Sequence, residues 1–146
     1  MSIIQAIRDY IAACPLLHEG AIVGVDRLGA HGVAYTIDTT PCEPVVHQYV
    51  DGGSMRQFLF VFASREAYGT KVLENLRNSG FYEDFAEWIE HNDVQGILPD
   101  LGADRRPYKI EITSSGYAYD TGDDTARYQM QLRLLYYQAR IGGQNG

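Results

Sequence analysis

The sequence has few residues of the kinds that hold metals, form disulfides or bind nucleic acid tightly. It has only two cysteines, Cys14 and Cys42, and no CxxC pair, which excludes a zinc site built on several thiolates. Lysine is equally rare, with Lys71 and Lys109 alone, and the formal net charge is −7. Because tight nucleic-acid binding requires clustered lysine and arginine side chains, we expect none here.

Long hydrophobic runs are also missing, and no stretch approaches the ~20 apolar residues that a membrane-spanning helix needs. The first residues lack the basic region of a signal peptide, and Arg8 and Asp9 interrupt the apolar run that follows. The composition is nevertheless globular, with 45% hydrophobic and 21% charged residues. It predicts one domain over residues 1–140, followed by a flexible tail at 141–146, and no membrane partner.

Sequence motifs of common enzymes are absent. The chain contains no GxSxG, HExxH, GxxxxGK[ST] or GxGxxG. The glycine pair Gly52–Gly53 precedes an expected strand and is better read as a turn than as a phosphate-binding loop. The aspartates of the segment 120–124 lack the spacing of a calcium loop. We therefore expect no cofactor, no metal and no enzymatic activity.

Apolar residues at helical spacing predict three helices. The first covers Ile3 to Ala13, with Ser2 as its N-cap. Two more are expected over Glu66–Asn78 and Phe81–His91, separated by Ser79–Gly80. The acidic residues of the last helix form either a solvated face or, as a less favoured alternative, an acidic surface in an oligomer.

Alternating apolar residues predict the strands. Met55 to Ala63 is expected to be a central strand, and the clearest alternation runs from Arg127 to Tyr137. The segments 21–27 and 32–38 are expected to form a hairpin, residues 45–50 an extended segment, and Tyr108 onward the remaining strand. The absence of regular βαβ order favours an α+β fold, with a mostly antiparallel sheet of about four or five strands and flanking helices.

One fragment has the form of part of an enzyme motif. His47 to Gly52 reads HxxxDG and resembles part of the HHxxxDG segment of chloramphenicol acetyltransferases, in which the second histidine is the general base. The position of the first histidine is Val46 here. A small acetyltransferase-like enzyme is therefore an alternative, but an ordinary histidine in an extended segment is the preferred interpretation.

Three longer stretches resemble one known family. They are YVDGGSMRQFLFVFASREA (49–67), NSGFYEDFAEWI (78–89) and TSSGYAYDTGDDTARYQMQ (113–131). Together they are similar to the minor capsid or tail terminator proteins of tailed bacteriophages and of prophages of Gram-positive bacteria. The resemblance runs from the N-terminal helix to about residue 135 and leaves out the carboxy-terminal tail.

This resemblance implies a tail-terminator-like fold and a structural role in the virion. Such proteins assemble as a ring, usually a hexamer, on the last ring of the tail tube, and they join it to the head connector. It implies as partners other copies of this chain, the tail tube protein and a connector or stopper protein. The location would be the virion, and the bacterial host cytoplasm during assembly. A head-completion or stopper protein is the alternative within this class.

Two polar segments are the candidate interfaces with other subunits or with the tube. The segment from Pro41 to Ser54 is long and polar enough to be an arm, and the residues that alternate along 127–133 form a polar sheet face. A solvated face explains the second pattern equally well. The candidate interface residues are Glu43, His47, Tyr49, Asp51, Arg56, Gln57, Arg127, Gln129, Gln131 and Arg133.

Overall fold

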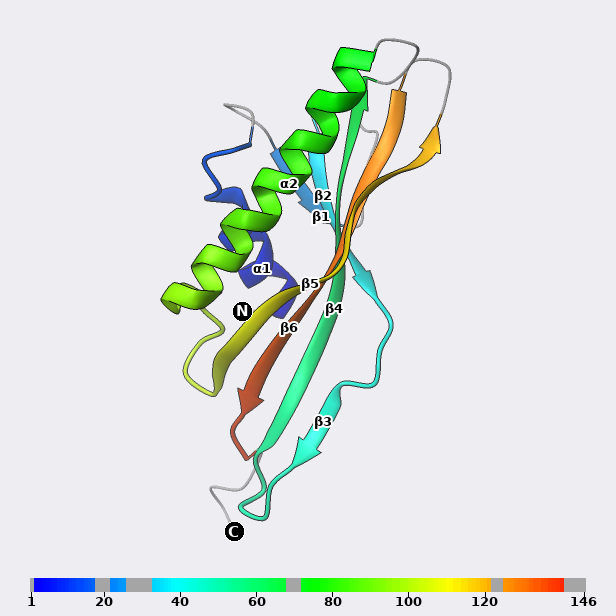
Figure 1. Ribbon diagram of the computed structural model, residues 1–146. Coiled ribbons are helices and arrows are strands. Elements are labelled where there is room, and N and C mark those ends of the chain that lie inside the picture. The colour runs from blue at the N-terminus through cyan, green and yellow to red at the C-terminus, as the bar shows by residue number, and fades with distance from the viewer. Residues whose placement is uncertain (1, 18–21, 26–32, 68–71, 122–124, 141–146) are drawn as a thin grey trace.

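Two helices lie on one side of a six-stranded sheet in the computed structural model of the chain, which describes residues 2–17, 22–25, 33–67, 72–121 and 125–140 (Figure 1). The elements are α1 (Ile3–Ala12), β1 (Ile22–Val25), β2 (Val33–Thr40), β3 (Val45–Gln48), β4 (Ser54–Ala67), α2 (Val72–Gln95), β5 (Arg105–Thr121) and β6 (Thr125–Gln138). The α+β class is confirmed, with one strand more than expected.

The sheet has the order β1-β2-β4-β6-β5, and β3 pairs with the same edge of β4 as β2 does, nearer the start of β4. All strand pairs are antiparallel except β1 with β2. The hairpin expected over residues 21–38 is therefore wrong, because its two strands run parallel; the connection 26–32 lies outside the described residues. Alternation predicts that two strands exist, but not their relative direction.

Strand β4 is the centre of the sheet, as the sequence predicts for Met55 to Ala63. It continues to Ala67 in an uninterrupted register with β6, so the first residues of the helix expected at Glu66 belong to the strand instead. The expected break at Ser79–Gly80 is also wrong, because α2 runs through it. A glycine inside a helix costs only about 1 kcal/mol, which the packing of Tyr82, Phe85 and Ile89 readily offsets.

The core fills the space between the helices and one face of the sheet. Phe62 is fully buried and stacks on Phe85 with ring centroids 4.3 Å apart, while Tyr35 lies 5.6 Å away on the neighbouring strand. From β6, the core receives Tyr128, Met130, Leu132, Leu134 and Tyr136, as the alternation predicts. Helix α1 adds Ile7 and Ile11 from its buried face, and its N-cap Ser2 accepts a hydrogen bond from the Gln5 amide.

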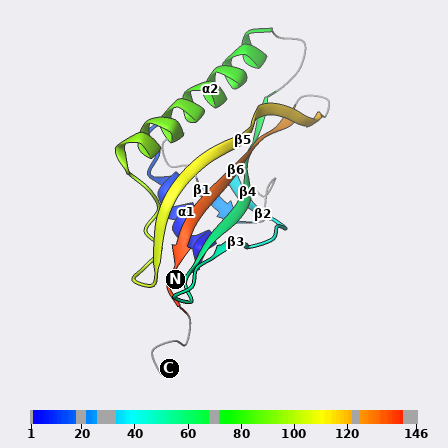
Figure 2. The same cartoon turned by 60° about the horizontal axis from the view of Figure 1, so that its bottom comes forward.

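The expected loop from Asp93 to Pro107 is shorter, because α2 extends to Gln95 and β5 begins at Arg105. Gly96, with a φ of 76°, ends α2 in the left-handed region. Pro107 lies inside β5, which is tolerated because β5 is an edge strand with an irregular register at that point. Figure 2 shows how strongly β5 curves over the sheet.

Candidate functional site

Neither α1 nor α2 covers the second face of the sheet, and the polar side chains that alternate along β6 lie on this face. Arg127, Gln129, Gln131 and Arg133 alternate with the buried residues of that strand, so they share this face, as the sequence predicts. Gln57 of β4 joins them through its register with Leu135. We call this surface the open face, made up of Thr36, Asp38, Gln57, Leu59, Val61, Ala63, Lys109, Glu111, Arg127, Gln129, Gln131, Arg133 and Leu135.

An ion pair crosses the open face diagonally. The Arg127 guanidinium in β6 donates to the Asp38 carboxylate in β2 across 2.6 Å, and the two side chains are only 18% and 27% exposed. Between these strands lies Ala63 of β4, which is fully buried although no helix covers this face. The small side chain of Ala63 leaves room for the arginine to pass over the central strand. The pair therefore joins β6 to β2 across β4.

A second ion pair joins the two last strands on the same face. Arg133 donates to Glu111 of β5, and another nitrogen of its guanidinium lies 3.4 Å from the amide oxygen of Gln57 in β4. Asp38 and Arg127, and Glu111 and Arg133, are thus paired with one another on the open face, and Lys109 pairs with Asp93 of α2. These paired charges do not form the cluster of free cations that binds a polyanion.

The β3–β4 hairpin projects beyond both helices (Figure 1). Its tip, which we call the hairpin tip, consists of residues 47–53. The Gly52 amide donates to the Tyr49 carbonyl, and the Tyr49 amide donates to the Gly53 carbonyl, which closes a tight turn. Gly52 adopts a φ of 93°, which favours glycine, and the Gly53 amide donates to the Asp51 carboxylate. The tip is therefore a defined structure.

Aromatic rings gather at this tip. The rings of His47 and Tyr49 meet edge to face, with centroids 4.7 Å apart, and Tyr49 lies 6.0 Å from Tyr137 of β6. The Tyr137 hydroxyl lies 3.5 Å from Asp51. Together with Gln48 and Val50, these four residues line an open pocket of about 520 Å³. Val50 is fully exposed beside it, and Val46 of the same hairpin is 52% exposed.

The structure divides the ten candidate interface residues into two groups. His47, Tyr49 and Asp51 meet at the hairpin tip, whereas Gln57 and the four polar residues of β6 lie on the open face. Glu43 is exposed just before β3, and its carbonyl accepts a hydrogen bond from the Gln57 amide group. Arg56 belongs to neither group, because its register with Tyr136 places it on the face that carries the helices.

Sequence reasoning missed three residues that complete these groups. Asp38 and Glu111 supply the carboxylates that pair with the open-face arginines, and Tyr137 supplies one wall of the pocket. Tyr137 could have been found from the sequence, because it continues the polar alternation of β6 beyond Arg133. The two carboxylates could not, because their partners are known only once the strand order is known.

Comparison with protein-family models gives no match for this chain, and no curated protein matches it. Within the described residues, no group of three or more histidine, cysteine or acidic side chains is placed to hold a metal ion. None of the described helices is long and apolar enough to cross a membrane.

The pocket at His47 bears on the acetyltransferase-like alternative. His47 meets the edge of Tyr49, and Asp51 is held by the Gly53 amide and lies near the Tyr137 hydroxyl. Among the described residues, His47 forms no hydrogen bond or ion pair that would orient it as a general base. Its pocket is lined by Gln48, Tyr49, Val50, Asp51 and Tyr137.

Proposed function

We propose that this chain is a structural subunit of a tailed bacteriophage, which assembles as a ring on the end of the tail tube and joins it to the head. The observation that carries the proposal is the projecting β3–β4 hairpin, with its exposed valines and its aromatic pocket. Such a projection adds little to the core of its own subunit. Exposed apolar side chains beside an unpaired strand edge are typical of contacts with another chain.

Two further features support this role. The arginines Arg127 and Arg133 of the open face form ion pairs within the subunit. The open face can therefore contact the tube or line the lumen of a ring without binding DNA strongly. The resemblance of residues 49–67, 78–89 and 113–131 to tail terminators supports a position of the ring at the head-proximal end of the tail tube. In this role other copies of the chain, the tube protein and the connector or stopper are its partners, and a hexamer is the expected ring.

The experiment is to replace residues 43–53 with a short glycine-serine linker in a phage that carries this gene. Val45 is the only half-buried residue of the described β3, so the variant should still fold, which circular dichroism of the purified chain checks. Because the linker removes the projecting contact, we expect overlong tails that do not join heads, measured by electron microscopy.

The control exchanges acidic residues that lie on α2, away from the hairpin. Glu83→Gln combined with Glu87→Gln and Glu90→Gln changes more charges than the linker does but leaves the hairpin intact, and tails of normal length are expected. Tails of normal length joined to heads in the linker phage would contradict the terminator role. Tails of normal length that stay free of heads would favour a head-completion or stopper role instead.

A further inference from the structure

The sheet has two free edges at the same height, at the end where the β3–β4 hairpin projects. The register places His47 of β3 beside Met55 of β4, Met55 beside Tyr137 of β6, and Tyr137 beside Arg106 of β5. Among the described residues, β3 pairs only with β4, and β5 only with β6. One row of side chains on the open side of the sheet therefore starts at the aromatic pocket and ends at an arginine.

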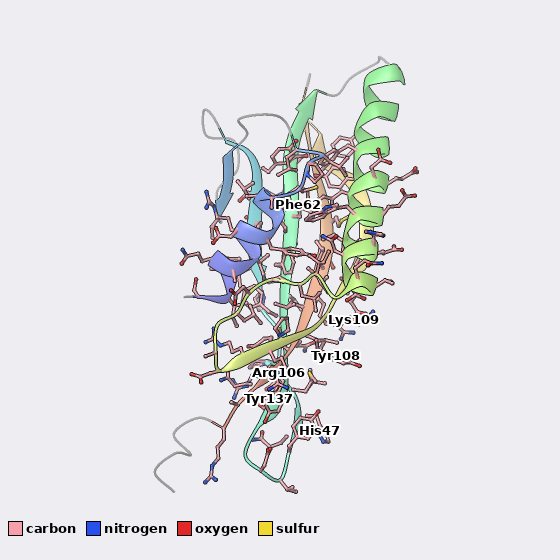
Figure 3. All side chains as sticks on the ribbon, turned by 90° about the vertical axis from the view of Figure 1, so that its left-hand side faces the viewer. His47, Phe62, Arg106, Tyr108, Lys109 and Tyr137 are labelled. Carbon is pink, nitrogen blue, oxygen red and sulfur yellow. The ribbon has the colours of Figure 1, made fainter. Side chains whose placement is uncertain are left out.

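Arg106 is a cation without a partner in the described part of its own chain. Its side chain is exposed and forms no hydrogen bond or ion pair there, whereas those of its neighbours do: Arg105 donates to Gln138, and Lys109 pairs with Asp93 at 2.8 Å. Figure 3 shows Arg106 close to Tyr137, at the start of β5, with Tyr108 and Lys109 above it. Tyr108 is 65% exposed, so an apolar side chain accompanies the free cation at this edge.

The pocket at the other edge has the chemistry that an arginine side chain prefers. Tyr49 and Tyr137 line the pocket with aromatic rings on which a planar cation can pack, and the Asp51 carboxylate at the pocket wall offers an acceptor. Its volume of about 520 Å³ is ample for one side chain. The exposed Val46 and Val50 beside the pocket match the exposed Tyr108 beside Arg106.

We propose that Arg106 of one copy of the chain inserts into this pocket on the next copy, against the tyrosine rings and beside Asp51. The inference rests on the proposed ring and names its contact. The directions of the strands fit: β3 and β5 lie three strands apart in an antiparallel sheet, so β5 of one copy runs antiparallel to β3 of the next. Such a contact joins two different surfaces, which builds a ring when the rotation between copies closes.

The proposed contact between β5 of one copy and β3 of the next should be weak. Pro107 lies at the β5 edge and has no amide proton, so the two edges cannot form an unbroken ladder of backbone hydrogen bonds. Side chains therefore carry most of the contact, and a single contact between two free copies is easily broken. A template that holds all copies close together reinforces it around the ring.

Two single substitutions each remove one side of the contact. Arg106→Gln removes the inserted cation, and Tyr49→Ala removes one ring of the pocket without touching the backbone hydrogen bonds of the turn. Arg8→Gln is the matched control, because it removes one positive charge from α1, on the helical side of the sheet. In sedimentation experiments at up to millimolar concentration, we expect the first two to weaken self-association by about tenfold or more, and the control to behave as the original chain.

Mixing the two variants gives the decisive result. Each retains the surface that the other lacks, so an equimolar mixture should form heterodimers through one intact contact, but no rings. Sedimentation at the same millimolar concentration should detect dimers in the mixture that neither variant forms alone. Failure of the mixture to form heterodimers would overturn the inference, as would an original chain that stays monomeric at millimolar concentration. Either result would leave the tail-length experiment to decide the proposed function separately. Conversely, heterodimers in the mixture would support this contact, and tails of normal length in the linker phage would at the same time contradict the terminator role.

Discussion

Strand β4 belongs to two different regions, the part of the sheet that the helices cover and the projecting β3–β4 hairpin. Where β4 passes under α2, Phe60 and Phe62 are fully enclosed, and their partners Leu132 and Met130 on β6 are buried too. Near its start, the same strand pairs with β3, whose residues are mostly exposed. A substitution in the first region should therefore lower the free energy of unfolding. A substitution in the second region should instead weaken the association between copies of the chain.

The largest expected effect comes from the centre of the covered half. Phe62→Ala removes a fully buried ring that stacks on Phe85, so we expect a loss of about 3–5 kcal/mol in the free energy of unfolding, measured by urea denaturation. Val50→Ala at the exposed tip is the comparison, with a change of less than about 0.5 kcal/mol. Similar losses for both substitutions would contradict the division of the sheet into two regions.

Two tyrosines, one in each region, allow the same comparison with the removal of a single hydroxyl group. The Tyr82 hydroxyl is buried, lies 2.7 Å from the Ser64 hydroxyl and donates to the Tyr128 carbonyl at 3.0 Å. Tyr82→Phe leaves those partners without it, which should cost about 1–3 kcal/mol. Tyr137→Phe loses only a long contact with Asp51 at the tip, and about 0.5 kcal/mol or less is expected.

The result for Tyr137→Phe separates stability from assembly. Because the ring remains, the pocket should keep most of its affinity for Arg106 of the next copy. The same urea series gives the stability of both variants, and sedimentation gives their association. A Tyr137→Phe chain as unstable as Tyr82→Phe would mean that the tip contributes to the core.

Side-chain periodicity predicted the elements of this fold better than their pairing. The alternation along 127–137 gave both the strand and its buried face, because a strand between a core and an open surface must alternate. It could not show that residues 21–27 and 32–38 run parallel. It also placed a helix at Glu66, because residues that extend β4 and residues that begin α2 are not separated by a clear signal.

Only some of the residues of the candidate site could be predicted, because periodicity gives the face of a strand but not its partner. The polar residues of β6 could be assigned to one face from spacing alone, but their ion pairs with Asp38 and Glu111 depend on contacts 89 and 22 residues apart in the chain. Arg106 gave no signal in the sequence. Its position across from the pocket follows only from the register of four strands.

The smallest expected effect is a loss of stability at alkaline pH. Burial raises the pKa of the Tyr10 and Tyr136 hydroxyls and of the Cys14 thiol, and the Asp93 carboxylate raises the pKa of the Lys109 ammonium. Each raised pKa means that the folded chain holds its proton to a higher pH than the unfolded chain does. The stability that these groups contribute is therefore fully present below their unfolded pKa values, from about 8.5 for the thiol to about 10.4 for the ammonium, and is lost as the pH rises through the folded values.

Urea denaturation between pH 7 and pH 11 measures this loss of stability. Two substitutions test how much of it comes from the helical side of the sheet and how much from the β5 edge. Of these four groups, Cys14 ionises first in the unfolded chain, so with Cys14→Ala the decline should begin about one pH unit higher. Lys109→Met removes an ion pair at the β5 edge, and it should change the alkaline slope little, because the Lys109 side chain is 42% exposed and solvent screens the pair. A decline that starts at the same pH without Cys14 would show that the thiol on the helical side does not carry the first step.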